Sequence, residues 1–326
     1  MGIEYILKNF PLRVSLTDFC NLRCFFCSNE GMPSDRKNRT HIDLNSLKFL
    51  ISTLAKNGLE NLSLTGGEPT LYPKLKELLL FISSFSFKNT FFHTNGIELS
   101  RNLISGGLKN FTKIAVTIHT TDQRTWQRIT GGTNLQFKKL QNNLKLLSKM
   151  KNGPKIEIKH VAIRGFDDSQ EILKRFLDFC AENNFKFKFL NFEPIEKDQQ
   201  NLVIPFQELK RKLESIGCKF LNFQGPFRGQ SSYLPISWYK YKNTKGVVIE
   251  IGCGHPEACE ACFNANEIFV MPTLEIKPCH ISPQTIPLKQ FIKNNDQKAL
   301  CRAVVKSREI LKLKPGENKH YWRENK

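Results

Sequence analysis

Short apolar runs alternate with longer amphipathic stretches from the N-terminus to about residue 192. The apolar runs have the length and composition of buried strands. They are Leu12–Thr17, Asn61–Thr65, Thr90–Thr94, Ile114–Ile118, Ile156–Ile163 and Phe187–Phe192. Apolar positions with a helical period predict helices at Leu44–Lys56, Lys74–Phe85, Asn134–Lys149 and Gln170–Asn183. A shorter helix fits Gln123–Thr130, with Thr121 or Asp122 as its cap.

Strands that alternate with helices predict parallel βαβ units and an α/β fold. Six such strands suggest a partial (β/α)6 TIM-like barrel, in which the chemistry gathers at the carboxyl ends of the strands. Cys20, Gly66, Asn95 and His119 follow or end predicted strands. We therefore expect these four residues to converge at one mouth of the barrel.

The pattern changes after about residue 220, where glycines and prolines interrupt it and cysteines become frequent. The last strongly helical segment is Gln297–Leu313, and a basic tail follows it. We therefore expect a partial barrel over residues 1–220 and a C-terminal region over residues 221–326 that carries an auxiliary site.

Composition adds limits on partners and location. The chain has 326 residues and a net charge of +19, which permits an anionic partner such as a nucleotide. Lysines occur together with many asparagines, and basic patches with interleaved aromatics are not evident, so nucleic-acid binding is not expected. No apolar run is long enough to span a membrane. The start of the chain, Met1–Tyr5, lacks the features of a signal peptide, so a cytoplasmic location is expected.

The strongest chemical signal is the spacing C-x3-C-x2-C formed by Cys20, Cys24 and Cys27 after the first predicted strand. Three thiolates on one short loop can bind three irons of a [4Fe–4S] cluster and leave the fourth iron open to a small molecule. Structural zinc prefers four ligands, and the nearest histidine is His41. A disulfide is not expected in a chain without secretory features. We therefore expect a cluster with an open iron, which is a site for chemistry.

A second signal follows the second predicted strand, in the run Gly66-Gly67-Glu68-Pro69. The glycines allow the backbone to approach a ligand closely, and the carboxylate can pair with a ligand ammonium. Taken alone, the run is also typical of a strand–turn–helix junction in which Pro69 starts the helix. The cysteine loop after the preceding strand favours the ligand site.

Together these motifs resemble those of the radical S-adenosylmethionine (SAM) superfamily, from about Leu12 to Phe192. The resemblance implies that a cluster on Cys20, Cys24 and Cys27 binds SAM and cleaves it to a 5′-deoxyadenosyl radical, which makes these cysteines catalytic. It also implies SAM contacts. The residues implied are Gly66, Gly67 and Glu68 at the amino group of SAM and Phe26 near its adenine.

Further segments are similar to one branch of that superfamily, the GTP 3′,8-cyclases of molybdenum-cofactor synthesis. Thr94-Asn95-Gly96 and the hydroxyl residue Thr117 occupy positions that help to hold SAM in that branch. Taken alone, Asn95-Gly96 is also an ordinary turn and Thr117 an ordinary strand residue.

A second group of cysteines lies in the C-terminal region. The cyclases bind a second [4Fe–4S] cluster through three C-terminal cysteines, and Cys259, Cys262 and Cys279 resemble these. Cys253 can add a fourth ligand, which would turn the cluster into an electron conduit rather than a substrate site. The same four cysteines can alternatively form a structural zinc site.

The chain also departs from the cyclases where they contact GTP. Asn264 and Asn266 stand where the cyclases have a pair of arginines, and the chain ends Arg323–Lys326 rather than in Gly-Gly. Arg13 is retained at the position of a functional arginine. Lys159 and Lys188 lie on predicted strands and can face an anionic group, although each is also compatible with a solvated lysine.

The expected function is therefore radical SAM chemistry on a nucleotide-like or small anionic substrate other than GTP. Hydrogen abstraction would lead to carbon–carbon bond formation or rearrangement, with an electron supplied by a reductant such as flavodoxin or ferredoxin. Two alternatives stay open: a maturase of a ribosomally made peptide, and a non-catalytic iron–sulfur protein for electron transfer or redox sensing.

Overall fold

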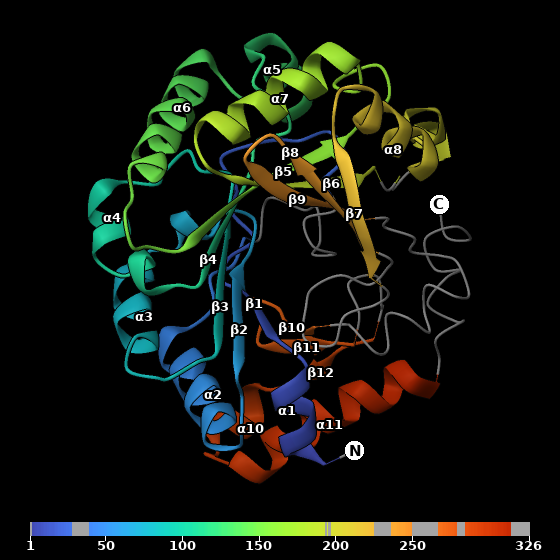
Figure 1. Cartoon of the computed structure of the whole chain (residues 1–326). Helices are drawn as coiled ribbons and strands as arrows, with labels where there is room; N and C mark the ends of the chain where they lie inside the picture. Colours follow the sequence, from blue (N-terminus) through green and yellow to red (C-terminus); the bar gives the residue numbers. More distant parts are fainter. Residues whose placement is uncertain are drawn as a thin grey trace.

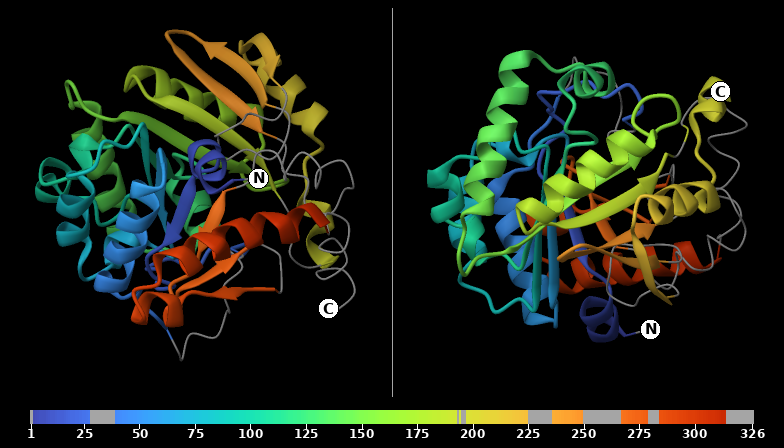
Figure 2. Two further views of the ribbon diagram at one scale, coloured as in Figure 1. Left: turned by 90° about the horizontal axis from the view of Figure 1, so that it is seen from below. Right: turned by 45° about the horizontal axis from the view of Figure 1, so that its top comes forward.

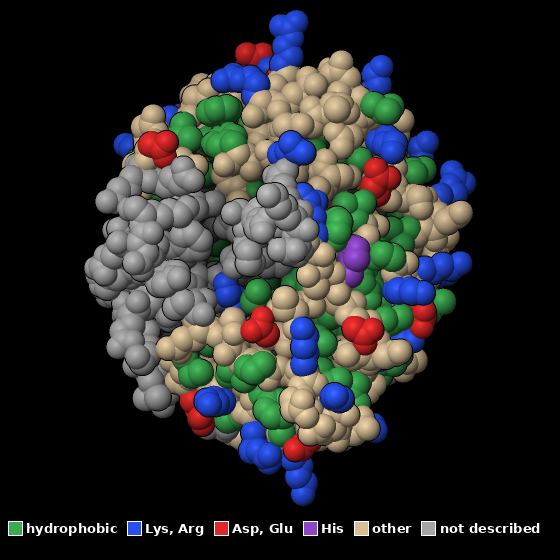
Figure 3. All heavy atoms as spheres, turned by 180° about the vertical axis from the view of Figure 1, so that it is seen from behind, with side chains coloured by type: hydrophobic (Ala, Val, Ile, Leu, Met, Phe, Trp, Pro, Cys, Tyr) green, Lys and Arg blue, Asp and Glu red, His purple; other side chains and the backbone are tan. Residues whose placement is uncertain are grey.

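One curved sheet with helices around its outer side forms the body of the protein (Figure 1). The computed structural model describes residues 2–27, 39–192, 194, 197–224, 236–249, 267–278 and 284–313. None of the helices in these ranges is both long enough and apolar enough to cross a membrane. Lysine and arginine side chains are scattered over the face shown in Figure 3 and do not gather into one patch.

Six parallel strands lie side by side in chain order, and each corresponds to a predicted strand. They are β1 (Leu12–Ser15), β2 (Asn61–Thr65), β3 (Asn89–Thr94), β4 (Lys113–Thr117), β5 (Lys155–Ala162) and β6 (Lys186–Asn191). The predicted α/β partial barrel is therefore confirmed in its central part.

The predicted helices are also confirmed, with shifts of a few residues at some ends. They are α2 (Leu44–Lys56), α3 (Leu75–Ile82), α5 (Gln123–Thr130), α6 (Asn134–Ser148), α7 (Gln170–Glu182) and α11 (Gln297–Leu313). Of the two cap candidates for α5, Asp122 is the cap, because its side chain accepts a hydrogen bond from the Thr125 N–H. Thr133 and Gln136 form a capping box at the start of α6.

Several shorter elements did not emerge from the sequence pattern. The helices are α1 (Ile3–Asn9), α4 (Arg101–Ser105), α8 (Phe206–Ser215) and α10 (Lys289–Lys293), with 3-10 turns η2 (Pro69–Leu71), η3 (Leu108–Asn110) and η4 (Lys197–Leu202). The strands are β7 (Lys219–Gln224), β8 (Ile236–Tyr241), β9 (Thr244–Ile249), β10 (Ile268–Val270), β11 (Glu275–Lys277) and β12 (Ile286–Pro287).

The late strands extend both margins of the central sheet (Figure 2). Strand β9 pairs in parallel with β6, and β10 pairs in parallel with β1. Among the described strands, β12 and β7 are the two edges, so the sheet is an open, partial barrel. Strands from both sides of residue 220 thus join one sheet, and the division into two regions there stays a prediction.

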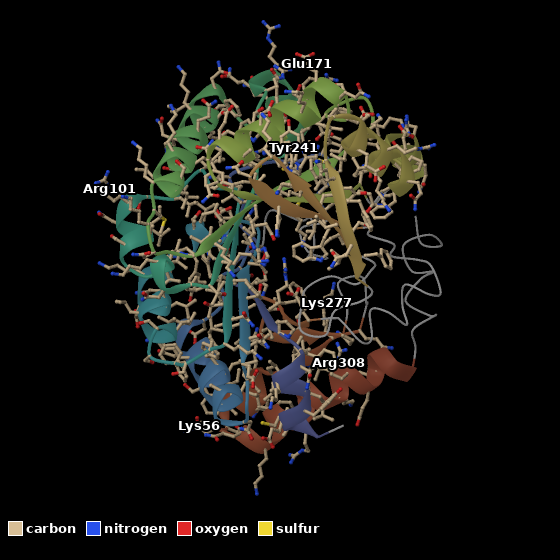
Figure 4. All side chains as sticks on the ribbon, in the orientation of Figure 1. Lys56, Arg101, Glu171, Tyr241, Lys277 and Arg308 are labelled. Atoms are coloured by element: carbon tan, nitrogen blue, oxygen red, sulfur yellow. The ribbon has the colours of Figure 1, made fainter. Side chains whose placement is uncertain are left out.

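The two faces of the sheet differ in polarity. Apolar residues such as Leu62 and Leu64 of β2 and Ile158 of β5 pack in the core beneath the helices. Side chains alternate along a strand, so the neighbouring positions, such as Ser63 and Lys159, project to the concave side. The helices therefore cover an apolar outer face, while the concave face carries polar and charged groups that can meet a ligand. Figure 4 shows the side chains on both faces.

Candidate active site

The cysteine loop leaves β1 and is fixed to its surroundings by hydrogen bonds to the loop backbone and to Asn21. The Arg23 N–H donates to the Thr130 carbonyl at 2.8 Å, and the Phe25 N–H donates to the carbonyl of Ile129 at the end of α5. Two further bonds hold Asn21. Gln136 Nε2 donates to the Asn21 carbonyl at 3.0 Å, and Asn95 Nδ2 donates to Asn21 Oδ1 at 2.7 Å. The loop is therefore positioned by α5, α6 and β3 independently of any group that the cysteines bind.

The three thiols of this loop differ in exposure. Cys20 and Cys24 are half-buried, Cys27 is exposed, and none of them is in a disulfide. Burial raises the pKa of Cys20 to about 11 and raises the pKa of Cys24 further, and repulsion by Cys27 adds to both shifts. Three thiolates are therefore costly here unless a cation compensates them, and the irons of a cluster would supply that charge.

The spacing of the thiols also bears on the kind of metal group. Among the described residues, no three cysteine, histidine or acidic side chains meet closely enough to hold a single metal ion. A cubane cluster places its ligating sulfurs on separate irons and so accepts wider spacing than one ion does. The loop supplies three thiolates, which is one fewer than structural zinc usually takes and the number that leaves one iron of a cluster open.

Gly66 and Gly67 allow the end of β2 to pack directly against the backbone of the cysteine loop. The Gly67 N–H donates to the Thr17 carbonyl at 2.7 Å, and the Glu68 N–H donates to the Phe19 carbonyl at 2.6 Å. A Cβ atom on Gly67 would lie 2.3 Å from the Phe19 oxygen, and one on Gly66 would lie 2.5 Å from the Thr17 oxygen. The close approach seen here is thus to the loop, while contact of these glycines with SAM stays a prediction.

Glu68 is 1% exposed and links the ends of β2 and β3. Its carboxylate accepts hydrogen bonds from the N–H and hydroxyl of Thr70, from the hydroxyl of Thr94 at 2.7 Å and from the Asn95 N–H at 2.7 Å. Asn95 Nδ2 lies 3.9 Å from Cys20 Sγ, which connects this network to the first cysteine. Burial raises the pKa of Glu68 despite these bonds. A ligand ammonium beside this carboxylate would favour its charged form.

A Glu68→Gln variant is expected to bind SAM about tenfold more weakly or worse. The neutral amide would lack the negative charge that pairs with the SAM ammonium, and a hydrogen bond to a charged group contributes about 1.5–3 kcal/mol. Equilibrium binding of SAM to the reconstituted protein measures this effect. Glu77→Gln is the matched control, because the Glu77 carboxylate lies on the surface beside Lys48. Equal SAM affinities of the two variants would contradict this role of Glu68.

An aromatic group lies beside the third cysteine at the ends of β4 and β6. The Phe26 ring meets His119 edge-on at 5.2 Å and Phe192 at 5.9 Å between centroids. His119 is 3% exposed and has a left-handed backbone with φ of 60°. Burial lowers its pKa to about 3, so its ring is neutral. Thr117 ends β4 on the concave face. Phe26 and Thr117 thus lie at this mouth. Contacts of Phe26 with adenine and of Thr117 with SAM stay predictions.

The concave face also carries a charged cluster that reaches from β10 and β1 to β6. Arg13 Nη1 forms a 3.1 Å ion pair with Glu267 Oε2, and Arg13 Nη2 donates to Thr65. Lys113 pairs with Glu157 at 3.4 Å. Burial lowers the pKa of Lys188, and the other charges that act on it are Glu157, Lys113, Glu267 and Arg13. Arg13, Lys159 and Lys188, which the sequence analysis singled out, are thus brought together.

A cavity of about 490 Å³ opens beside this cluster, between β3–β6 and the β8–β9 hairpin. Its lining includes Phe91, Lys113, Glu157, Lys188 and Trp238. Lys113 and Glu157 belong to no motif and were not among the predicted site residues. The signal that could have found Glu157 is the alternation of Lys155, Glu157 and Lys159 along β5, where a strand of a fully buried sheet would be apolar on both faces.

The predicted residues of the auxiliary site cannot be placed in the same way. Cys253, Cys259, Cys262, Asn264, Asn266 and Cys279 all lie outside the described residues. The second cluster, its zinc alternative and the departures from the arginine pair stay predictions.

Comparison with known proteins adds a family and a fold. The family model described as "Radical SAM superfamily" matches residues 14–177, half of the chain. A GTP 3′,8-cyclase from Pasteurella multocida is 25% identical over 307 residues, which cover 92% of this chain and 86% of the relative. A GTP 3′,8-cyclase from Stenotrophomonas maltophilia (strain R551-3) is 28% identical over 292 residues, covering 89% and 86%.

Among solved structures, Streptococcus suis SuiB bound to its precursor peptide SuiA matches with a TM-score of 0.63 and 15% identity. The match covers 90% of this chain and 64% of SuiB, so the chain spans about two thirds of the length of that protein. At this identity the likeness shows a shared fold. It agrees with the partial barrel described above.

Proposed function

The chain belongs to the radical SAM superfamily, whose members use a [4Fe–4S] cluster and SAM, and on this premise we propose a specific function for it. It cleaves SAM reductively and abstracts a hydrogen atom from an anionic, nucleotide-like substrate held on the concave face of the sheet. Carbon–carbon bond formation or rearrangement follows. A protein reductant such as flavodoxin or ferredoxin supplies the electron.

The residues of the mouth have distinct roles in this proposal. Cys20, Cys24 and Cys27 hold the cluster, which when bound supplies the electron that splits SAM into methionine and a 5′-deoxyadenosyl radical. The Glu68 carboxylate accepts a hydrogen bond from the SAM ammonium, and Asn95 connects Glu68 to the cysteine loop by contacts with both. The other proposed SAM contacts come from the glycines, strand ends and aromatic ring around them. These are Gly66, Gly67, Thr94, Thr117 and Phe26.

The excess of cations on the concave face is the observation that carries the substrate class. Arg13, Lys113 and Lys188 lie around the amine of Lys159 on this face and outnumber the nearby carboxylates Glu157 and Glu267. Like charges brought together away from bulk water are destabilising unless an anion joins them. A phosphate or carboxylate group of the substrate would supply that anion. The GTP 3′,8-cyclase relatives support a nucleotide-like molecule.

A second [4Fe–4S] cluster on Cys259, Cys262 and Cys279 is part of the same proposal, with Cys253 as a further ligand of that region. The resemblance to the cyclases over most of the chain supports it. Asn264 and Asn266 stand in place of the arginine pair, and fewer cations there favour a substrate with less charge than a triphosphate.

The substrate class is tested with inorganic phosphate as a probe of the concave cluster. A Lys188→Gln variant is expected to bind the probe about tenfold more weakly, because a hydrogen bond to a charged group contributes about 1.5–3 kcal/mol. Isothermal titration of the reconstituted protein measures the affinity. Lys56→Gln removes the same charge at the exposed end of α2, labelled in Figure 4, and should leave binding unchanged. Equal losses in both variants would assign the binding to net charge and overturn the proposed site.

A further inference from the structure

Three side chains from three strands form a hydrogen-bonded chain across the concave face. Lys159 Nζ on β5 lies 2.7 Å from His93 Nδ1 on β3, and His93 Nε2 lies 3.0 Å from Ser63 Oγ on β2. Ala115 of β4 is the register partner of His93. Strand β4 lies between β3 and β5 in the sheet, so the Lys159 side chain spans β4 to reach His93.

The roles of donor and acceptor in this chain depend on which ring nitrogen of His93 carries the proton. Burial lowers the pKa of His93 well below its ordinary value, with Lys159 and Arg13 adding to the shift, so the ring is neutral. A neutral ring has one accepting and one donating nitrogen. When Lys159 is an ammonium it can only donate, so Nδ1 accepts from it and Nε2 carries the proton toward Ser63 Oγ. Ser63 is fully buried and His93 is 9% exposed, so bulk water does not compete for these bonds.

The Lys159 amine ends this hydrogen-bonded chain and lies among charged side chains of β1, β4, β5 and β6. Burial is the largest influence and lowers its pKa well below the ordinary value, because the ammonium loses hydration. Lys188 of β6, Arg13 of β1 and Lys113 of β4 lower it further, and Glu157 of β5 opposes them. A lysine that serves only as an anion anchor keeps its charge, whereas a lysine that loses its charge easily can accept a proton.

Resting on the proposed function, we propose that Lys159 is an acid–base residue of the substrate chamber, positioned by His93 and Ser63. The substrate class it fits bears a hydroxyl or amine on the carbon from which hydrogen is abstracted. A hydroxyl on a radical carbon is a stronger acid than the hydroxyl of the parent alcohol. In the proposed step the O–H bond breaks and an N–H bond forms on Lys159 Nζ. The amine becomes an ammonium, and the hydroxyl-bearing radical centre loses one proton and gains one negative charge as a ketyl.

The test is the titration of Lys159 in the anaerobic, cluster-reconstituted protein, measured without turnover. Acetic anhydride labels neutral amines, and mass spectrometry of the peptide that contains Lys159 gives its labelling rate against pH. The exposed Lys56 in the same sample is the internal reference. We expect the midpoint of Lys159 to lie well below that of Lys56. Coincident midpoints would overturn the proposal.

Neighbouring variants sharpen the result, because their expected shifts have opposite signs. Lys188→Gln should raise the midpoint of Lys159 by removing a nearby cation, and Glu157→Gln should lower it by removing the opposing carboxylate. His93→Leu should lower it further, because the ammonium loses its acceptor, which a purely structural role of His93 would not produce. Midpoints that stay in place in all three variants would overturn the assignment.

These outcomes are separate from those of the proposed function. The titration does not depend on SAM cleavage, so loss of cleavage with a low Lys159 midpoint would refute the radical chemistry and the step that depends on it, while the proton-accepting amine would stand. Normal cleavage with an ordinary midpoint would refute only the acid–base site.

Discussion

A Cys24→Ala variant is expected to lose SAM cleavage down to the background of protein-free controls. Cys24 is the middle ligand of the loop, and without it two thiolates remain for a cluster that needs three from this loop. The loop itself should keep its fold, because its anchors are hydrogen bonds of Arg23, Phe25 and Asn21 rather than bonds to the thiols. Iron content after anaerobic reconstitution and release of 5′-deoxyadenosine with dithionite measure the two consequences.

Cys301→Ala provides the matched control for this change. Cys301 lies on α11, is half-buried and packs against the edge of the apolar core. Its replacement removes one thiol of the same size far along the chain from the loop, and iron content and cleavage should both persist. A Cys24→Ala protein that keeps the iron of the SAM site and still releases 5′-deoxyadenosine would refute the assignment of the loop.

The second large effect is expected from the addition of one methyl group at Gly67. A Cβ atom there would lie 2.3 Å from the Phe19 oxygen and 2.8 Å from the Asp18 oxygen. Both obstacles are backbone atoms, so no side-chain rotation relieves the clash. Gly67→Ala should separate the end of β2 from the cysteine loop and break the two backbone hydrogen bonds between them, each contributing about 0.5–1.5 kcal/mol. We therefore expect a lower melting temperature and loss of iron binding.

Gly2→Ala tests whether the loss of iron binding and stability is specific to a methyl group at Gly67. A Cβ atom on Gly2 meets nothing within 4 Å, so this variant should match the unmodified protein in iron content and melting temperature. If Gly67→Ala incorporates iron as well as Gly2→Ala does, the proposed packing of the two motifs is wrong.

The sequence predicted the central fold because its signals there are local. Apolar runs and helical periods are contained within single elements, and Asp122 caps α5 from the adjacent position. The margins of the sheet escaped prediction because their strands are short and pair over long separations. Ile268 of β10, for example, pairs with Leu12 of β1, and no local pattern in a three-residue strand specifies that partner.

Likewise, some residues of the candidate site could be predicted from local sequence and others could not. The cysteine motif and Gly66–Glu68 could be identified because each lies within a few residues of sequence. The Lys159–His93–Ser63 chain could not, since each residue is a single polar position on a different strand. Only the order and register of β2 to β5 bring the three together. The sequence also suggested that the glycines approach a ligand, whereas the structure shows them against the backbone of the cysteine loop.

Reductive cleavage of SAM by the unmodified protein tests the central claim most directly. The protein is reconstituted anaerobically with iron and sulfide, reduced with dithionite and mixed with SAM, and the products are separated by liquid chromatography. The account predicts 5′-deoxyadenosine and methionine in equal amounts, with neither formed when the cluster is left out. A fully loaded, folded protein that releases no 5′-deoxyadenosine would contradict it.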